Sequence, residues 1–296
     1  MSQLHILDLK FLNLPHTIAS FLIESSDGPI LIETGPHSTI GAMKKGLSKY
    51  GYKVEDIKHV FLTHIHLDHA GAAWVFAEHG ANIYLHPFGA KNMEDPTRLM
   101  ESATRIYGDQ MDQLWGQMKK ISAEQLIEVG HKEIVQIGDV VLKSLHTPGH
   151  AKHHIAWQFD DVIFTGDVAG VKIDEGIVVP PCPPPDINIE EWKNSIELIR
   201  ELKPKKLYLT HFDKIENINE HLNSLETILD NWAEWIKEHW KAGESNEEMG
   251  PQFMEHVAGQ LRAVGLNNAA IQLYEAANPF WMSVAGLVRY WKKKNL

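Results

Sequence analysis

The chain has 296 residues, of which 44% are hydrophobic and 23% charged, and this balance is typical of a folded globular protein rather than a disordered one. Its formal net charge of −11 argues against a nucleic-acid partner, because an acidic surface repels phosphate groups. With a single cysteine, Cys182, the chain has neither a disulfide framework nor a multi-thiolate zinc site of its own. The apolar runs are shorter than the roughly 18 residues that a membrane span needs. Residues 1–24 lack the features of a secretion signal, so we predict a cytoplasmic protein without a membrane partner.

Predicted strands and helices alternate along the first half of the chain, which indicates an α/β fold. Apolar or alternating runs predict strands at residues 18–24, 29–33, 57–62 and 83–86. Apolar spacing and glycine stops predict helices at about residues 38–50 and 72–79. The segment 95–129 carries an apolar stripe at helical spacing, and we expect helices there that either pack on the core or form an apolar wall beside a site.

The second half begins with strands and then becomes helical. Strands are predicted at 139–147, 154–159, 162–165 and 206–209, a helix at 190–202 and a proline-rich loop at 179–185. After residue 215 only helices are predicted, and the first of them, at 218–240, is strongly amphipathic. We therefore predict an α/β domain, residues 1–214, and a C-terminal helical segment, residues 215–296. This segment packs on the core, shapes the entrance to a site, or forms a homodimer contact.

A cluster of metal-competent side chains follows the predicted strand 57–62: His64, His66, Asp68 and His69. In a strand His64 and His66 project to the same face, and a turn past the strand end aims Asp68 and His69 at a neighbouring point. A lone histidine is more often a hydrogen-bonded or exposed residue than a ligand. Four such groups at the edge of the core would lack partners unless a cation bound them. We interpret the cluster as part of a dinuclear metal site.

Three further predicted strands end close to a metal-competent residue. His150 follows the strand 139–147, Asp167 follows 162–165, and His211 follows 206–209. Because sites in layered α/β folds gather at the ends of strands, we expect these three residues to join the cluster.

Taken together, His64-x-His66-x-Asp68-His69, Thr-Pro-Gly-His150, Thr-Gly-Asp167 and Leu-Thr-His211 resemble the metallo-β-lactamase superfamily in order and rough spacing. The resemblance covers residues 1 to about 214 and implies an αββα four-layer sandwich of two mixed β-sheets with helices on the outer faces. The Asp68-His69-Ala70-Gly71 form is similar to the glyoxalase II and acyl-homoserine-lactone lactonase branches. The C-terminal helices resemble those of an uncharacterised prokaryotic hydrolase subgroup. Glu33 stands where an aspartate is usual, and residues 168–172 lack the tyrosine that lactonases place near the substrate carbonyl.

The resemblance also implies a role for each candidate residue. One ion would be bound by His64, His66 and His150, the other by Asp68, His69 and His211, with Asp167 bridging the two. Glu33 and His154 would support these ligands without touching metal.

The implied chemistry is hydrolysis at two divalent metal ions. Nitrogen and oxygen ligands suit zinc, with iron or manganese as alternatives. Two ions about 3.5–4 Å apart would hold a bridging hydroxide that attacks a carbonyl carbon. Asp68 and Asp167 are the predicted catalytic residues, and Asp68 would hand a proton to the leaving group. We predict a hydrolase of a small ester, thioester or lactone with an apolar acyl part. His16 and the loop around Cys182 lie at the entrance or are purely structural.

Three other functions stay open on the sequence. The same fold supports mononuclear-iron dioxygenases that act on thiol persulfides, and no residue pattern here excludes one. An RNA-processing nuclease would need a basic substrate face, and the acidic balance counts against it. A non-catalytic binding protein would not need a complete set of metal-binding residues. Every expected residue of that set is present, which counts against this function.

Overall fold

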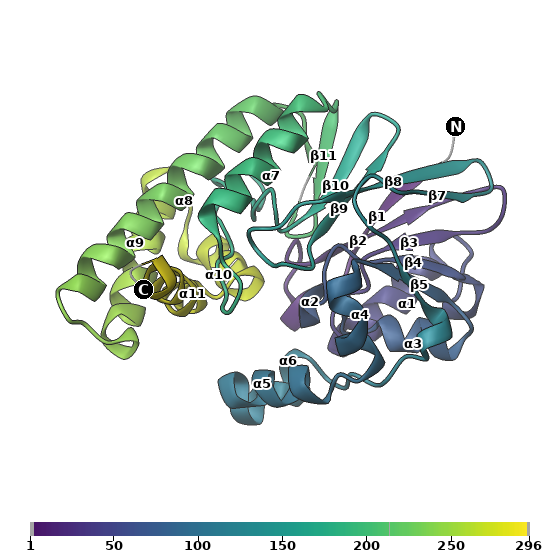
Figure 1. Cartoon of the computed structure of the whole chain (residues 1–296), viewed down its shortest axis with the longest axis horizontal. Coiled ribbons are helices and arrows are strands. Elements are labelled where there is room, and N and C mark those ends of the chain that lie inside the picture. The colour runs from purple at the N-terminus through teal and green to yellow at the C-terminus, as the bar shows by residue number, and fades with distance from the viewer. Residues whose placement is uncertain (1–2, 213, 295–296) are drawn as a thin grey trace.

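The computed structural model describes residues 3–212 and 214–294, and its framework is a pair of mixed β-sheets that pack face to face (Figure 1). The first sheet has the order β1-β2-β3-β4-β5-β6, with β1 (Leu4–Asp8), β2 (Ala19–Ile23), β3 (Ile30–Ile32), β4 (His59–Phe61), β5 (Asn82–Leu85) and β6 (Leu126–Glu128). The second has the order β12-β11-β10-β9-β8-β7, with β7 (Ile134–Ile137), β8 (Val140–His146), β9 (Ile155–Phe159), β10 (Val162–Gly166), β11 (Lys206–Leu209) and β12 (Lys214–Ile215). Strands β3 to β6 run parallel, as do β10 and β11, and the other neighbours are antiparallel.

Helices cover both outer faces of this pair of sheets. The α-helices of the described residues are α1 (Ile40–Ser48), α2 (Leu67–Ala70), α3 (Ala73–Glu78), α4 (Pro87–Glu94), α5 (Thr97–Tyr107), α6 (Met111–Leu114), α7 (Ile189–Glu201), α8 (Ile218–Lys241), α9 (Asn246–Ala263), α10 (Asn268–Ala277) and α11 (Phe280–Lys294). None of these helices, within the described part of the chain, is long and apolar enough to cross a membrane.

Three apolar cores hold the layers together. Between the sheets, aromatic side chains such as Phe21, Phe61 and Trp157 interlock. Helices α1 and α3 pack on the outer face of the first sheet, and α7 packs on the second through Trp192 and Ile196. Since strands covered on both faces bury both sets of side chains, they appear in the sequence as continuous apolar runs. The predicted αββα sandwich is confirmed.

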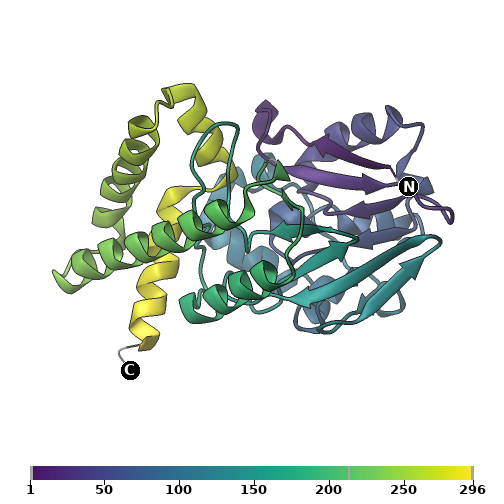
Figure 2. The same cartoon turned by 90° about the horizontal axis from the view of Figure 1, so that it is seen from above.

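The C-terminal helices share the core of the second sheet. Helix α8 lies alongside α7 (Figure 2), and the side chains of Trp232, Phe253, Tyr274 and Phe280 are fully buried in the same cluster as Trp192. This packing agrees with the expectation that the segment covers the core. The boundary between residues 214 and 215 stays a prediction.

The segment 95–129 is the part of the fold that differs most from expectation. Helix α5 ends at Tyr107, α6 spans one turn, and the segment finishes in strand β6. Gly108 and Gly116 have φ angles of +52° and +66°. These angles lie outside the right-handed helical region, so the two glycines interrupt the long helical segments that the sequence predicts here.

Candidate metal centre

The His64–His69 segment lies beyond the end of a strand, not within it. Strand β4 stops at Phe61, so strand alternation does not explain how His64 and His66 face each other. Instead His66 is extended, with φ −63° and ψ 154°, and immediately precedes the one-turn helix α2, which carries Asp68 and His69. This turn brings His64 Nε2 to 2.9 Å from His66 Nδ1. The two imidazoles converge as expected, but a turn produces the convergence.

Four side chains form the first potential ligand group: His64, His66, His150 and Asp167. His150 Nε2 lies 3.0 Å from His66 Nδ1, and Asp167 Oδ2 lies 3.2 Å from His150 Nε2 and 3.8 Å from His64 Nε2. Each side chain turns a nitrogen or oxygen toward one common point, and these atoms all lie within 4.8 Å of one another. One cation fits among them.

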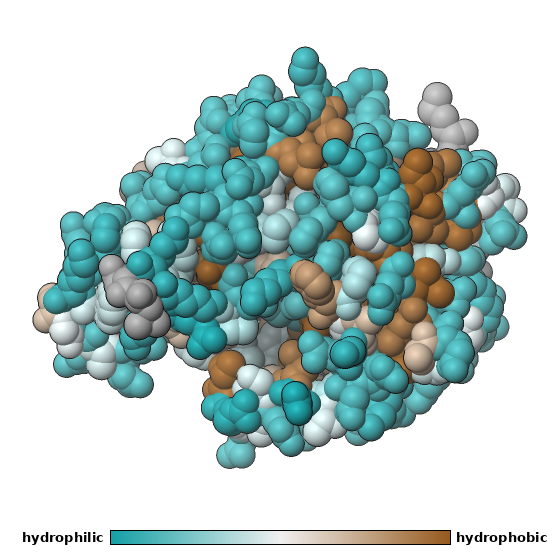
Figure 3. Space-filling model, in the orientation of Figure 1, coloured by the Kyte–Doolittle hydropathy of each residue, from teal (hydrophilic) through white to brown (hydrophobic). Residues whose placement is uncertain are grey.

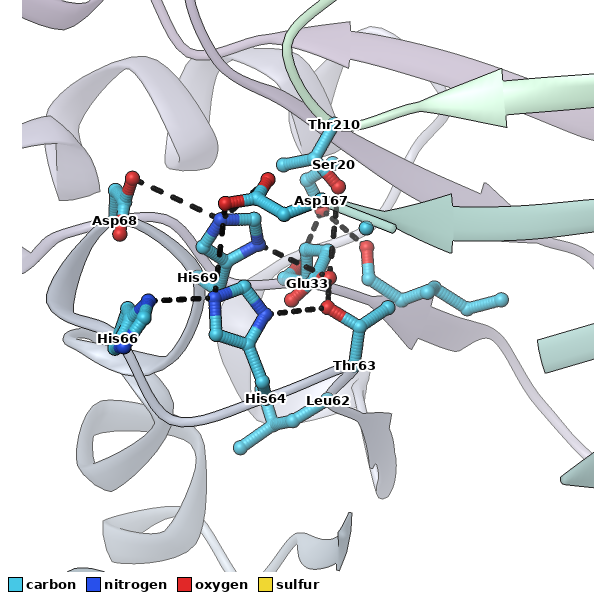
Figure 4. Close-up of polar contacts among 12 residues, drawn as sticks. Ser20, Glu33, Leu62, Thr63, His64, His66, Asp68, His69, Asp167 and Thr210 are labelled. Atoms are coloured by element: carbon cyan, nitrogen blue, oxygen red, sulfur yellow. Dashed lines mark hydrogen bonds and ion pairs between the residues drawn. The ribbon is translucent and has the colours of Figure 1, made fainter. Parts of the chain in front are cut away.

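The second group is Asp68, His69 and His211. Asp68 Oδ2 lies 3.4 Å from His211 Nε2 and 3.7 Å from His69 Nε2. Asp167 faces this group with its other oxygen, because Oδ1 lies 3.3 Å from His69 Nε2 and 3.5 Å from His211 Nε2. Figure 4 shows the Asp167 carboxylate above the His64 and His69 rings. Asp167 therefore presents one oxygen to each group, as a bridging ligand requires.

Unpartnered atoms in this cluster support a cation there. His69 Nε2 and Asp167 Oδ1 are buried and lie 3.3 Å apart, yet their geometry is not that of a hydrogen bond, and neither atom has another hydrogen-bond partner in the described residues. Buried polar atoms without partners are costly, so native proteins rarely leave them so. A divalent cation beside both atoms would remove this cost. The residues fit a pair of divalent cations.

In four of the five rings of the two groups, the nitrogen that faces away from the cluster contacts a protein oxygen. The Nδ1–H groups of His150 and His211 donate to the carbonyl oxygens of Pro181 and Thr17, each at 2.8 Å. His69 Nδ1 lies 3.2 Å from Glu33 Oε1, and His64 Nδ1 lies 3.0 Å from Thr63 Oγ1. Such contacts fix the tautomer, so that Nε2 is left to bind a cation.

Glu33 and His154 lie behind the ligands, where the sequence interpretation placed supporting residues. Glu33 is fully buried and accepts hydrogen bonds from the hydroxyl groups of Thr63 and Thr210 as well as from His69 (Figure 4). His154 Nε2 accepts the backbone N–H of Asp167 at 3.2 Å, so this ring fixes the position of Asp167 without presenting a free nitrogen to the cluster.

The pKa values of the histidines differ between the two groups. Burial lowers the pKa of His64 and of His150, and it lowers the pKa of His66 to about 3. Because a desolvated imidazole favours its neutral form, these rings offer lone pairs at neutral pH. The first group is therefore ready to accept a cation.

In the second group, His69 lies near three carboxylates, those of Asp167, Asp68 and Glu33. Burial alone would lower the pKa of His69, but the nearby Asp167, Asp68 and Glu33 outweigh it and raise that pKa well above its usual value. Burial alone would raise the pKa of Asp167, yet the surrounding imidazoles hold it well below its usual range. Protons on imidazole thus neutralise the buried acids, and a cation would replace those protons.

A cavity of about 410 Å³ opens over the cluster, where His66, Asp68 and Asp167 form its polar end. The remaining wall is mostly apolar and includes Phe11, Ile18, Leu99, Ala103, Ile106, Tyr107, Trp115, Pro183, Ala277, Pro279 and Met282. Figure 3 shows a recess on this face with hydrophobic side chains at its edge. Both alternatives for segment 95–129 therefore hold, because its helices line this cavity and also pack on the core of the first sheet.

Of the two entrance candidates, the loop around Cys182 borders the cavity and His16 does not. Cys182 is fully buried and does not line the cavity, although its neighbours Pro181 and Pro183 do. His16 contacts Asp174 and Phe212 outside the cavity. The sequence interpretation missed His153, Asn278 and Met282, which line the cavity. No periodicity or motif marks them, because their position depends on how remote segments pack.

Fold and site together define the class of this chain. Residues 14–211 match the family model of the metallo-beta-lactamase superfamily, and the chain belongs to that superfamily. Its members are mostly metal-dependent hydrolases.

The protein ST1585 is similar to this chain both in sequence and in fold. The metallo-beta-lactamase fold-containing protein ST1585 of Sulfurisphaera tokodaii is 31% identical over 183 residues, which cover 58% of this chain and 67% of that protein. The crystal structure of ST1585 from Sulfolobus tokodaii covers 75% of this chain and 86% of its own, at 26% identity and a TM-score of 0.64.

Two further matches differ in how much of this chain they cover. The structure of TTHA1429 from Thermus thermophilus, at 18% identity and a TM-score of 0.65, covers 99% of this chain and 94% of its own, so the shared fold extends to the C-terminal helices. An N-acyl homoserine lactonase of Bacillus cereus is 33% identical over 91 residues, only 23% of this chain and 36% of that enzyme.

Proposed function

We propose that this chain is a dinuclear metal-dependent hydrolase of a small ester, thioester or lactone with an apolar acyl part. The observation that carries the proposal is the position of Asp167, whose two oxygens face two separate groups of nitrogen and oxygen donors. His64, His66 and His150 would hold one ion, and Asp68, His69 and His211 the other. Zinc is the expected metal, because imidazole and carboxylate ligands suit it, and iron and manganese are the alternatives.

A pair of divalent ions lowers the pKa of water toward about 7 and polarises a carbonyl oxygen, which is the chemistry that ester and lactone hydrolysis needs. Side chains and backbone of the protein would position the ions and transfer the proton. Asp167 fixes the separation of the two groups, and Asp68, which lines the cavity, is placed to pass a proton to a leaving group. Glu33 and the Pro181 carbonyl hold the ligating rings in place.

The cavity favours a small substrate with an apolar part. Side chains such as Leu99, Ile106 and Met282 face an acyl group, while the polar end lies at the ligand cluster. Ligand pockets of a few hundred Å³ with few polar groups suit drug-sized molecules rather than a polymer. The formal net charge of −11 counts against an RNA substrate.

Hydrolysis assays on protein reconstituted separately with zinc, manganese and iron test the proposal. We expect turnover of at least one member of a panel of lactones, thioesters and nitrophenyl esters, with a preference for apolar acyl chains. The Asp68→Asn variant should lose most of that activity, whereas His16→Ala, which alters a residue outside the cavity, should match the unmodified protein. Oxygen consumption with a thiol persulfide, and no turnover on the panel with any metal, would favour the iron dioxygenase instead.

A further inference from the structure

The long connection between β10 and α7 carries two parts of the site. Asp167 lies at its beginning, and Pro181, whose carbonyl accepts the Nδ1–H of His150, lies near its end. Few of its backbone groups pair with one another, and one isolated bridge joins Val171 to Val179. Its shape must therefore come from the elements that pack against it.

The C-terminal helices hold this connection at successive points. His221 on α8 lies with its Nε2 2.8 Å from the carbonyl oxygen of Ala169. The hydroxyl of Tyr274 on α10 accepts the backbone N–H of Ile173 at 3.0 Å and donates to the carbonyl of Ile177 at 2.7 Å. These three points lie between Asp167 and Pro181, so α8 and α10 determine the path of the chain from one to the other.

Helix α11 contacts the same connection at Cys182, the residue after Pro181. The backbone N–H of Cys182 donates to Ser283 Oγ at 3.3 Å, and both residues are fully buried. One turn further along, Gly286 faces the carbonyl of Cys182 so closely that a Cβ on Gly286 would lie 1.9 Å from that oxygen. A Cβ is excluded there, so this glycine allows the helix to approach the backbone.

This contact lies one residue from the carbonyl that orients His150. Pro181 has no N–H of its own, and its position is set through its neighbours. A displacement of Cys182 by α11 would move the Pro181 carbonyl, which lies 2.8 Å from His150 Nδ1. Helix α11 also lines the substrate cavity with Met282.

We propose that Ser283 and Gly286 are positioning residues for the first ligand group: through Cys182 and Pro181 they hold the His150 ring at the angle at which it binds a cation. This inference rests on the two-ion site of the proposed function. The C-terminal helices then contribute to the metal centre, because α11 lines the substrate cavity with Met282 and fixes a ligand through Ser283 and Gly286.

Zinc titration of metal-free protein against a chromophoric chelator tests this role. His150→Ala and His211→Ala first identify which of the two measured affinities belongs to which group. We expect Gly286→Ala to weaken binding at the first group by roughly 10- to 100-fold, the usual effect of disturbing a residue that orients a ligand, and to leave the second group unchanged. Ser283→Ala should act in the same direction by a smaller factor.

Gly259→Ala on α9 is the matched control, because no atom lies within 4 Å of the Cβ that it would add. It should bind zinc as the unmodified protein does. Equal weakening at both groups, or unchanged binding at the first group in Gly286→Ala, would overturn the inference. If Gly286→Ala does not fold, Ser283→Ala decides alone, and first-group affinity within twofold of the unmodified protein would overturn it.

A second readout does not need metal. In the metal-free protein the Nδ1–H of His150 should give a slowly exchanging NMR signal, because it is buried and hydrogen-bonded. Ser283→Ala should shift that signal or speed its exchange, and Gly259→Ala should not. An unmodified protein that binds no zinc would contradict the proposed function. A signal in Ser283→Ala with unchanged position and unchanged exchange rate would contradict the positioning role alone.

Discussion

Glu33 Oε1 lies 3.2 Å from Nδ1 of His69, and both side chains are fully buried. The Glu33 backbone has a φ of +64°, a conformation in which a glutamate is uncommon and which is typical of functional sites. This uncommon backbone conformation places the Glu33 carboxylate beside Nδ1 of His69, the ring nitrogen that faces away from the candidate cation site.

Glu33→Gln should therefore weaken cation binding by roughly 10- to 100-fold, since the amide carries no charge and orients the ring less strongly. Glu33→Asp should also weaken binding, although its shorter side chain suits the left-handed backbone better, because the carboxylate then falls short of His69. Zinc titration of both variants measures the effect. Unmodified affinity in Glu33→Asp would show that the length of this side chain is unimportant.

Tyr107 on α5 supplies a hydroxyl to the cavity that holds Asp68, and none of the described residues hydrogen-bonds it. Burial, and then the negative charge of Asp68, raise the pKa of Tyr107, so the phenol stays protonated and can donate a hydrogen bond to substrate. Tyr107→Phe should lower kcat/KM about tenfold, the effect of losing one such bond, without changing metal content. Steady-state kinetics with any substrate that the protein hydrolyses, together with metal analysis, check both parts. An unchanged kcat/KM would remove Tyr107 from the reaction.

Glu275 on α10 gives stability a pH dependence that is separate from the metal centre. Burial raises the pKa of Glu275 from 4.5 to about 7. Between these two values the unfolded chain loses its proton while the folded chain keeps it, so stability falls as pH rises from about 4.5 to 7 and is level above that. The side chain is partly exposed, so the size of the fall is modest.

Glu275→Gln should remove this dependence. Thermal unfolding of both proteins across pH 4.5 to 8 should give a difference in Tm that grows toward pH 7 in favour of the variant and then stays constant. A difference that is the same at every pH would show that Glu275 titrates normally.

The convergence of the candidate ligands could be predicted from the sequence because each of them follows an apolar strand directly or within a few residues. His211, for example, comes two residues after β11, and Asp167 comes one residue after β10. The prediction that His64 and His66 lie within a strand was wrong. The two side chains still converge, because short turns after strand ends lead to the same edge of the sheets.

Contacts made by backbone atoms or remote helices could not be predicted in this way. The Pro181 carbonyl that accepts from His150 could not be recognised in the sequence, because every residue has a backbone carbonyl. Asn278 and Met282 reach the cavity because α10 and α11 fold back over it, and the apolar pattern of a helix does not say which surface it will cover. Likewise the helical stripe in segment 95–129 predicted apolar packing but not the break at Gly108.

The number of divalent ions bound per chain tests the account most directly. Elemental analysis of protein reconstituted with zinc and then dialysed should find two ions per chain, and fewer than two in Asp167→Ala, which loses the carboxylate that faces both groups. That variant should also be inactive. Two tightly bound ions in Asp167→Ala, or none in the unmodified protein with zinc, manganese or iron, would contradict the account.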